Sequence, residues 1–338
     1  MKTELFRNPF KTFAYGLAAV FSMSFTGCSS DDNGSFNGTT NDHGVYRDLR
    51  FSEVDVQTVT YGEGGLEMDI YTPSEDESTD RPLIVFAHGG AFVGGNKGLP
   101  DMRRLCNRFA QRGYVAASIS YRLSNDPLLF FDSMEVLSVV TRAMHDGKAA
   151  IRYFRKSAAE NNPYGIDTNF IFGGGNSAGA ILMLHLAYMR NMNDIPAHLR
   201  DIIQAEGGLE GNQGNEGYSS KIHAVVNLAG AIHRLEYLQS GAPPLVSAHG
   251  DEDQTVPFDC DVVLQSFPSP EFRNVLCGSN PLHQRATDIN IPNDLLIFPG
   301  DDHCPWIEGN GTPTPKMDDV EMHVVEFLYN TFFAPLDL

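Results

Sequence analysis

The chain has 338 residues, of which 42% are hydrophobic and 20% charged, a composition typical of globular proteins. Its formal net charge of −19 argues against nucleic acid as a partner, because phosphate binding needs a basic face, and against electrostatic docking on anionic lipid. A chain of this length buries a core that can fold without metal ions or disulfides.

The first 27 residues have the features of a targeting signal. Basic residues precede the apolar stretch 13–25, which is too short to span a bilayer core of about 30 Å. The stretch runs into Cys28 and resembles the lipobox of bacterial lipoproteins, whose cysteine is diacylated and becomes the new N-terminus. We therefore expect a lipoprotein signal peptide over 1–27 and lipidation at Cys28, with a plain secretory signal as the alternative.

Residues 28–44 are almost all small or polar, which predicts a flexible tether to a domain over 45–338. The resemblance to lipoproteins implies that this domain lies outside the cytoplasm, anchored to the outer membrane. Acidic residues just after Cys28 also resemble the surface-export signal of Bacteroidetes lipoproteins, which would place the domain at the cell surface. Contact with the membrane is expected through the lipid anchor only.

Four cysteines remain after Cys28, and an oxidising compartment permits them to form disulfides. Cys260 and Cys277 would close a short loop and are the predicted pair. The alternative is that Cys260, Cys277, Cys106 and Cys304 are all free thiols. Because the sequence has no CxxC or His-x₃-His spacing, no zinc site or other metal site is predicted.

The body of the chain shows alternating strands and helices. A hairpin is expected first, followed by a buried strand and then a series of helix and strand segments. The predicted strands are 54–61, 67–71, 83–87, 115–120, 170–172, 224–228, 245–248 and 295–298. The predicted helices are 99–112, 134–160, 178–190 and 318–332. This rhythm predicts a mostly parallel central sheet with helices on both faces.

Two segments, 191–221 and 258–292, are longer than ordinary connections of about 2–6 residues. We expect both to overhang the carboxyl ends of the strands and to shape a pocket there. The alternative is that they are disordered surface insertions.

The G-x-S-x-G segment at 175–179 joins a predicted strand to a predicted helix, the context of a nucleophile elbow. A sharp turn places the middle residue in strained backbone space, and glycines remove side chains that would collide there. The hydroxyl of Ser177 is then exposed at the carboxyl edge of the sheet, close to the positive end of a helix dipole. Ser177 is the predicted nucleophile.

The segment HGGAF at 88–92 ends a predicted strand and resembles the HGGG loop of lipases and esterases. The tetrahedral intermediate of an ester carries a negative oxygen, which backbone N–H donors stabilise by about 3 kcal/mol each. By position, the resemblance implies that Gly90, Ala91 and Ala178 donate to this oxyanion. Ala91 departs from the third glycine of the commoner pattern, and His88 is expected to be structural.

The segment HGDEDQTVP at 249–257 resembles the HGxxDxxVP signature of α/β-hydrolases. The match assigns Asp253 as the carboxylate that orients the catalytic imidazole, with Asp251 as the alternative. His303 follows the last predicted strand and is the expected general base. An imidazole with a pKa of about 6.5 can take the proton of Ser177 and pass it to the leaving alcohol.

The order Ser177, Asp253, His303 is that of the α/β-hydrolases. From about residue 50 onward the chain resembles their carboxylesterases, and by motif the hormone-sensitive-lipase-like and the feruloyl or acetyl esterases. The resemblance implies an α/β-hydrolase fold with cap-like insertions, in which carboxylic esters are hydrolysed through an acyl-enzyme without metal or organic cofactor.

An extracytoplasmic location points to esters on external molecules, such as acylated glycans, in addition to small-molecule esters. A serine peptidase of the same fold and a non-catalytic surface binding lipoprotein are the alternatives. Trp306, close to His303, either lines the leaving-group side of the pocket or belongs to the core. The sequence carries no signal for an oligomeric state.

Overall fold

A computed structural model of the protein describes residues 45–126, 128–265 and 274–334. The predicted signal peptide, Cys28 and the tether over 28–44 lie outside the described residues. Within the described ranges, no helix combines the length and the apolar character needed to cross a membrane.

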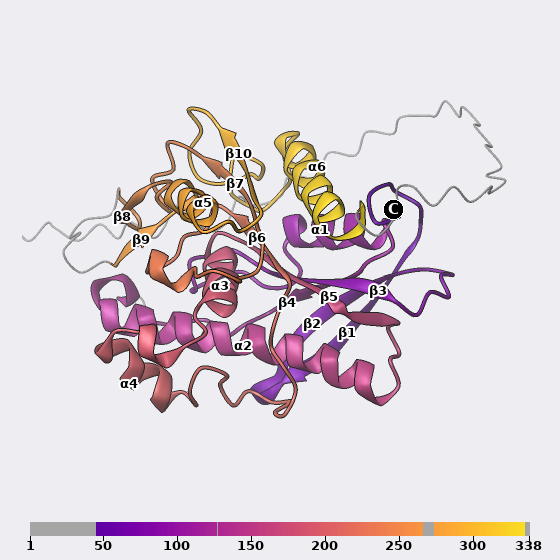
Figure 1. Ribbon diagram of the computed structural model, residues 1–338, viewed down its shortest axis with the longest axis horizontal. Coiled ribbons are helices and arrows are strands. Elements are labelled where there is room, and N and C mark those ends of the chain that lie inside the picture. The colour runs from indigo at the N-terminus through magenta and orange to yellow at the C-terminus, as the bar shows by residue number, and fades with distance from the viewer. Residues whose placement is uncertain (1–44, 127, 266–273, 335–338) are drawn as a thin grey trace, which may run out of the picture. The chain divides into compact units, whose positions relative to one another are not determined.

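Eight strands form one sheet in the order β1-β2-β4-β3-β5-β6-β7-β10 (Figure 1). The β1–β2 hairpin is antiparallel and joins β4 antiparallel, whereas all pairs from β4 to β10 are parallel. The predicted mostly parallel sheet is confirmed. The strands are β1 (Val54–Gly62), β2 (Leu66–Pro73), β3 (Arg81–Ala87), β4 (Val115–Ile119), β5 (Ile166–Asn176), β6 (Ala224–Leu228), β7 (Leu245–Gly250) and β10 (Asn293–Phe298).

Helices cover both faces of this sheet, as expected (Figure 1). Helices α1 (Pro100–Ala110) and α6 (Lys316–Leu328) share one hydrophobic cluster with the sheet. Helices α2 (Ser133–Glu160), α3 (Ala178–Tyr188) and α5 (Ser279–Asp288) pack on the opposite face, and α4 (Ala197–Ala205) lies against α2. Short helical turns are Glu63–Gly65, Leu129–Phe131, Met192–Asp194, Leu235–Tyr237 and Tyr329–Phe333.

The central strand β3 shows why the sheet needs both layers. All seven of its residues are buried, and after Arg81 its sequence is a continuous apolar run rather than an alternating one. Leu83 and Val85 point into the cluster that contains α2 and α3. Ile84 and Phe86 point into the cluster that contains α1 and α6, because successive side chains leave opposite faces of a strand.

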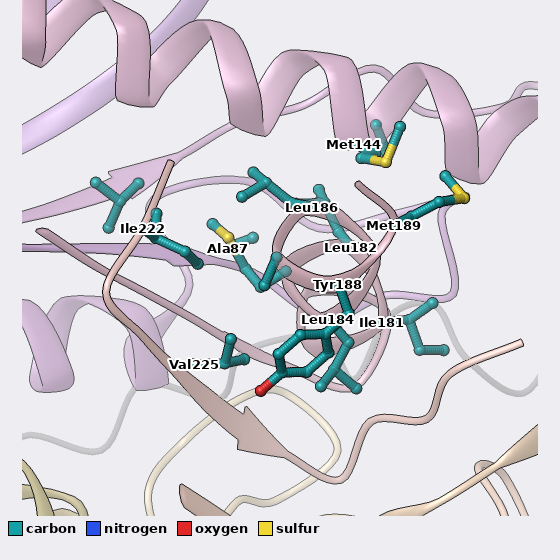
Figure 2. Close-up of a cluster of buried hydrophobic side chains, with 14 of the residues drawn as sticks. Ala87, Met144, Ile181, Leu182, Leu184, Leu186, Tyr188, Met189, Ile222 and Val225 are labelled. Carbon is teal, nitrogen blue, oxygen red and sulfur yellow. The ribbon is translucent and has the colours of Figure 1, made fainter. Parts of the chain in front are cut away.

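Helix α3 is apolar apart from His185, and every one of its residues is buried. Such a helix must be surrounded by protein rather than lie on a surface. Figure 2 shows this packing, with Met144 of α2 on one side of the helix and Val225 of β6 on another. The same helix begins directly after Ser177, so the core fixes the position of the predicted nucleophile.

Close backbone packing at the start of α3 requires glycine. A Cβ atom on Gly179 would lie 2.0 Å from the carbonyl oxygen of Ala87, at the end of β3. We predict that Gly179→Ala lowers the free energy of unfolding by about 3 kcal/mol, because neither backbone segment can move without disturbing the core. Thermal unfolding measures the effect. The matched control is Gly309→Ala, whose new methyl group meets no atom within 4 Å; equal melting temperatures for the two variants would contradict the prediction.

Candidate active site

Ser177 occupies the sharp turn between the end of β5 and the start of α3. Its φ of 54° and ψ of −118° are strained for a residue with a side chain, as expected for a nucleophile elbow. The N–H of Ser177 donates to the carbonyl oxygen of Leu228 at 2.7 Å, which ties the turn to the end of β6. The sequence prediction of a strand, a turn and a helix around Ser177 is confirmed.

The structure brings Ser177, Asp253 and His303 together. The Ser177 Oγ lies 2.9 Å from Nε2 of His303, and Nδ1 of His303 lies 2.6 Å from Oδ2 of Asp253. The other carboxylate oxygen of Asp253 accepts the N–H groups of Thr255 and Val256, both at 2.8 Å. Asp253 is therefore held from both sides in an orientation that faces His303.

Asp251, the alternative carboxylate, has a different contact. Its Oδ1 accepts the N–H of Gly300 at 2.6 Å, and its side chain does not reach the imidazole of His303. Asp302, on the loop of His303, accepts the N–H of Gln254, on the loop of Asp253, at 2.9 Å. These bonds join the two loops that carry Asp253 and His303, so Asp251 supports the loop geometry.

The pKa values of the three groups follow from their contacts. Burial alone would raise the pKa of Asp253, but hydrogen bonds from His249 and His303 outweigh it and lower the pKa below its usual range. Burial alone would lower the pKa of His303, but the contacts with Cys304 and Asp253 raise it above its ordinary value. Because burial raises the pKa of the Cys304 thiol, that thiol is uncharged at neutral pH and Asp253 supplies the facing charge.

A pH dependence follows if His303 must be neutral to accept a proton. Since its pKa is raised, the imidazolium persists to higher pH than in a free histidine. We predict that kcat/KM for an ester falls as the pH drops, with a midpoint above the ordinary histidine value of about 6.5. Initial rates between pH 5 and 9 check this, and a midpoint at or below the ordinary value would contradict it.

The loop after β3 has the backbone expected of an oxyanion site. Gly90 and Ala91 both have positive φ values, 120° and 52°, and the loop closes on itself because Val93 and Gly94 donate to the carbonyl oxygen of Gly90 at 3.0 Å. Among the described residues none accepts a hydrogen bond from the N–H of Gly90 or Ala91. Ala178 is the first residue of α3, where an N–H has no partner within the helix.

His88 packs beneath this loop and has the structural role that the sequence predicted. Its ring is buried and stacks on Tyr121 with ring centroids 4.3 Å apart. The Tyr121 hydroxyl donates to the carbonyl oxygen of His88 at 2.8 Å. This contact fixes the end of β3 from which the oxyanion loop starts.

A small apolar pocket of about 70 Å³ adjoins Ser177 and the oxyanion loop. Leu137 of α2 and Ile181 of α3 form part of its wall, and Leu276 comes from the 258–292 segment, which was correctly expected to shape the pocket. The expectation for 191–221 was wrong for this pocket, since among the described residues none from that segment lines it.

The 191–221 segment instead lies along the outer side of α2. Two buried cations of α2 hold it there: Lys148 donates to the carbonyl oxygen of Leu209 and to Glu210, and Arg152 donates to the carbonyl oxygens of Glu210 and Gly214. Because a buried cation needs hydrogen-bond partners, the segment is drawn down onto the helix and away from the pocket.

The 258–292 segment forms a short hairpin followed by α5. Strands β8 (Cys260–Val262) and β9 (Val275–Cys277) pair antiparallel, and the predicted disulfide between Cys260 and Cys277 is present. Cys106 and Cys304 are free and buried. The disulfide closes the base of the hairpin from which Leu276 reaches the pocket.

Removing this disulfide is predicted to affect stability and substrate binding together. For the variant with Cys260→Ser and Cys277→Ser we expect a loss of about 3 kcal/mol, because the unfolded chain regains the freedom of the open loop. KM for an ester should rise while kcat changes less, since the pocket wall loosens but Ser177 and His303 stay in place. Chemical denaturation and steady-state kinetics measure both effects. Reduction of the unmodified protein should reproduce them, and unchanged stability and KM would refute the prediction.

Sequence reasoning missed the contacts of Asn176, the residue before Ser177. Its Oδ1 accepts the indole N–H of Trp306 at 3.2 Å and the thiol of Cys304 at 3.3 Å, and its amide donates to Asp101 at 3.4 Å. Trp306 is fully buried in the core and does not line the pocket, which decides between its two interpretations. The side chain of Asn176 therefore ties the elbow directly to the His303 loop.

Within the described residues, no group of three or more histidine, cysteine or acidic side chains is placed to hold a metal ion.

Several known proteins are similar to this chain. The profile of a family described as BD-FAE matches residues 68–235. The chain is 27% identical over 143 residues to Probable carboxylesterase 2 of Arabidopsis thaliana, covering 41% of each chain. It is 24% identical over 238 residues to Esterase LipC of Mycobacterium tuberculosis, covering 64% of this chain and 55% of that protein. The chain thus spans about half the length of the curated relatives it matches.

Among solved structures, a thermophilic esterase of Thermogutta terrifontis with bound propionate superposes with a TM-score of 0.61 and 22% identity. The match covers 82% of this chain and 95% of that one. A structure of the same esterase with bound butyrate gives the same TM-score. Together with the strand order described above, the likeness establishes that the chain has the α/β-hydrolase fold.

Proposed function

We propose that the protein is a carboxylesterase that uses Ser177 as nucleophile, His303 as general base and acid, and Asp253 as the orienting carboxylate. The observation that carries the proposal is the continuous set of contacts from Ser177 Oγ through His303 to Asp253, at 2.9 and 2.6 Å. The esterase relatives support the same reaction class.

The proposed reaction has two steps. His303 accepts the Ser177 proton as Oγ attacks the ester carbonyl, and the resulting oxyanion is bound by the N–H groups of Gly90, Ala91 and Ala178. His303 then gives its proton to the leaving alcohol, which leaves an acyl-enzyme. Water activated by His303 hydrolyses the acyl-enzyme in the second step. Asp253 stays ionised throughout and stabilises the imidazolium.

The size of the pocket supports short acyl groups as substrates. A protein cavity of about 150 Å³ holds one benzene molecule, so a cavity of about 70 Å³ accommodates only a few carbon atoms. The apolar wall next to Ser177 suits an acyl chain rather than a sugar ring. The Thermogutta esterase was solved with propionate and with butyrate, which fits acyl groups of this size.

Hydrolysis of p-nitrophenyl acetate, butyrate and octanoate tests the proposal. We expect turnover of acetate and butyrate esters, with kcat/KM for octanoate at least about tenfold lower because the longer chain exceeds the cavity. A fluorophosphonate probe should label the protein, and peptide mass spectrometry should place the label on Ser177. Hydrolysis of peptide anilides without hydrolysis of esters would instead favour a serine peptidase, and a folded protein that neither reacts nor labels would favour a binding role.

We further propose that the natural esters are carried by external glycans and that the chain reaches them from a lipid anchor at Cys28. The support is the lipobox-like sequence before Cys28 and the polar stretch 28–44 that follows it. Incorporation of labelled palmitate by the unmodified protein but not by Cys28→Ser tests the anchor. Release of acetate from acetylated xylan tests the substrate class, and activity confined to free short esters would contradict it.

A further inference from the structure

A second histidine contacts the carboxylate of Asp253. His249 is at the end of β7, is fully buried, and places its Nε2 3.2 Å from Oδ2 of Asp253. The same oxygen lies 2.6 Å from Nδ1 of His303. Two imidazole N–H groups therefore converge on one carboxylate oxygen, one from the proposed general base and one from a residue that the proposed reaction does not use.

The contacts of His249 assign its protons. Its Nε2 also faces the carbonyl oxygen of Val256 at 3.1 Å, and because both neighbours are acceptors, Nε2 must carry hydrogen. Its Nδ1 lies 2.8 Å from the hydroxyl of Ser279, which accepts a hydrogen bond from the amide of Asn227 at 3.1 Å. The Ser279 hydroxyl is thus free to donate to Nδ1. The hydrogen on Nε2 of His249 is therefore directed at Asp253 and at the carbonyl oxygen of Val256.

The hydrogen bonds continue from Ser279 away from the site. Their further partners determine which group donates in each bond. Asn227 Oδ1 accepts the N–H of Gly230 at 3.0 Å, so its amide nitrogen must be the donor to both Ser279 and Ser247. The Ser247 hydroxyl donates to Nε2 of His283 at 2.8 Å. Every member of this buried chain has a partner, and a fully satisfied buried network holds its side chains in one arrangement.

We propose that His249 is a positioning residue for the esterase reaction, acting through Asp253. Its N–H holds Oδ2 toward His303 and withdraws part of the carboxylate charge that the imidazole faces. The titratable groups of the described chain that face His249 are Asp253 on its own loop, His303 on the loop after β10, and His283 on α5. The proposal rests on the proposed function, since it concerns the same catalytic carboxylate.

The test compares His249→Phe with His249→Gln. Phenylalanine keeps a ring of similar size but cannot donate, whereas the glutamine amide can still donate to Asp253 and accept from Ser279. For His249→Phe we expect kcat to fall about tenfold, the cost of one hydrogen bond to a charged group, while KM stays within about twofold. The midpoint of the acid limb of kcat/KM should rise by about half a unit, because Asp253 then presents more charge to His303. His249→Gln should recover most of both changes.

A purely structural role would give a different pattern. It predicts a lower melting temperature for both variants with no movement of the acid limb, and either that result or equal loss in the two variants would overturn the proposal. If His249→Phe does not fold, Ser279→Ala provides the test. That variant removes the donor to Nδ1 and the acceptor of one Asn227 N–H. We expect a smaller change in kcat and in the acid limb in the same direction; no change in either would overturn the proposal.

Proton NMR separates this inference from the proposed function. In protein labelled with ¹⁵N-histidine, the Nε2–H of His249 should give a resonance that couples to one nitrogen, is protected from exchange, and is absent in His249→Phe. This readout does not depend on turnover. If the signal is present but no ester is hydrolysed, the proposed function fails while the proton assignment stands. If esters are hydrolysed and the signal is missing, the positioning role is overturned.

Discussion

Ser177→Ala will lower kcat/KM for p-nitrophenyl acetate by about 10⁵-fold or more while leaving the fold intact. The hydroxyl is the atom that attacks the carbonyl in the proposed reaction, and alanine has no group to replace it. The backbone requirement at this position does not change, because alanine meets the same strain at φ 54° as serine does. The variant should therefore unfold within a few degrees of the unmodified protein.

Two measurements check this prediction. Ester hydrolysis gives the loss of activity, and thermal unfolding followed by circular dichroism shows that the loss is chemical. Ser118→Ala is the matched comparison, because it also removes one buried serine hydroxyl, and that hydroxyl makes no hydrogen bond within the described residues. Residual activity within about tenfold of the unmodified protein in Ser177→Ala would show that another residue is the nucleophile.

Asp253→Asn will lower kcat by about 10⁴-fold, and Asp251→Asn will change it by less than about threefold. Asparagine at 253 removes the charge that stabilises the imidazolium of His303, and its amide nitrogen can hold His303 in the wrong tautomer. At 251 the side chain accepts only the N–H of Gly300, and an asparagine oxygen does the same. The pair thus compares two carboxylates two residues apart in one loop.

Steady-state kinetics on both variants decides between the two carboxylates. KM should change little in either, because neither side chain lines the pocket beside Ser177. A large loss in Asp251→Asn together with a small loss in Asp253→Asn would reverse the assignment. Similar losses in both would mean that the loop geometry, rather than the charge facing His303, limits the reaction.

The centre of the sheet could be predicted from the sequence because β3, β4, β6 and β7 are buried on both faces. Apolar runs such as Leu83 to Ala87 are favourable only in the interior of a fold. The helices between them could be predicted from their helical periodicity of apolar residues. The hairpin β8–β9 and the helices α4 and α5 could not be predicted. They are short, and tertiary contacts hold them, including the disulfide between Cys260 and Cys277 and the packing of α4 against α2.

The contacts of Ser177, Asp253 and His303 followed from motifs at strand ends, because parallel strands bring their carboxyl ends to one edge of a sheet. The side chains that hold these three residues in place could not be predicted from the motifs. His249 belongs to the same motif as Asp253, but only the fold shows that Ser279, thirty positions further on, orients its ring. The side chain of Asn176 reaches Trp306 across 130 positions, a distance over which no local pattern carries a signal.

Helix α3 begins at the predicted nucleophile and is enclosed by the core along its whole length. The conformation of the nucleophile turn therefore depends on the folded core. Partial loosening of core packing would move Ser177 out of its catalytic position even if the surface loops stayed folded. Loss of enzymatic activity would therefore report early on disorder in the core. On slow heating, the loss of activity and the loss of near-ultraviolet dichroism should follow one curve.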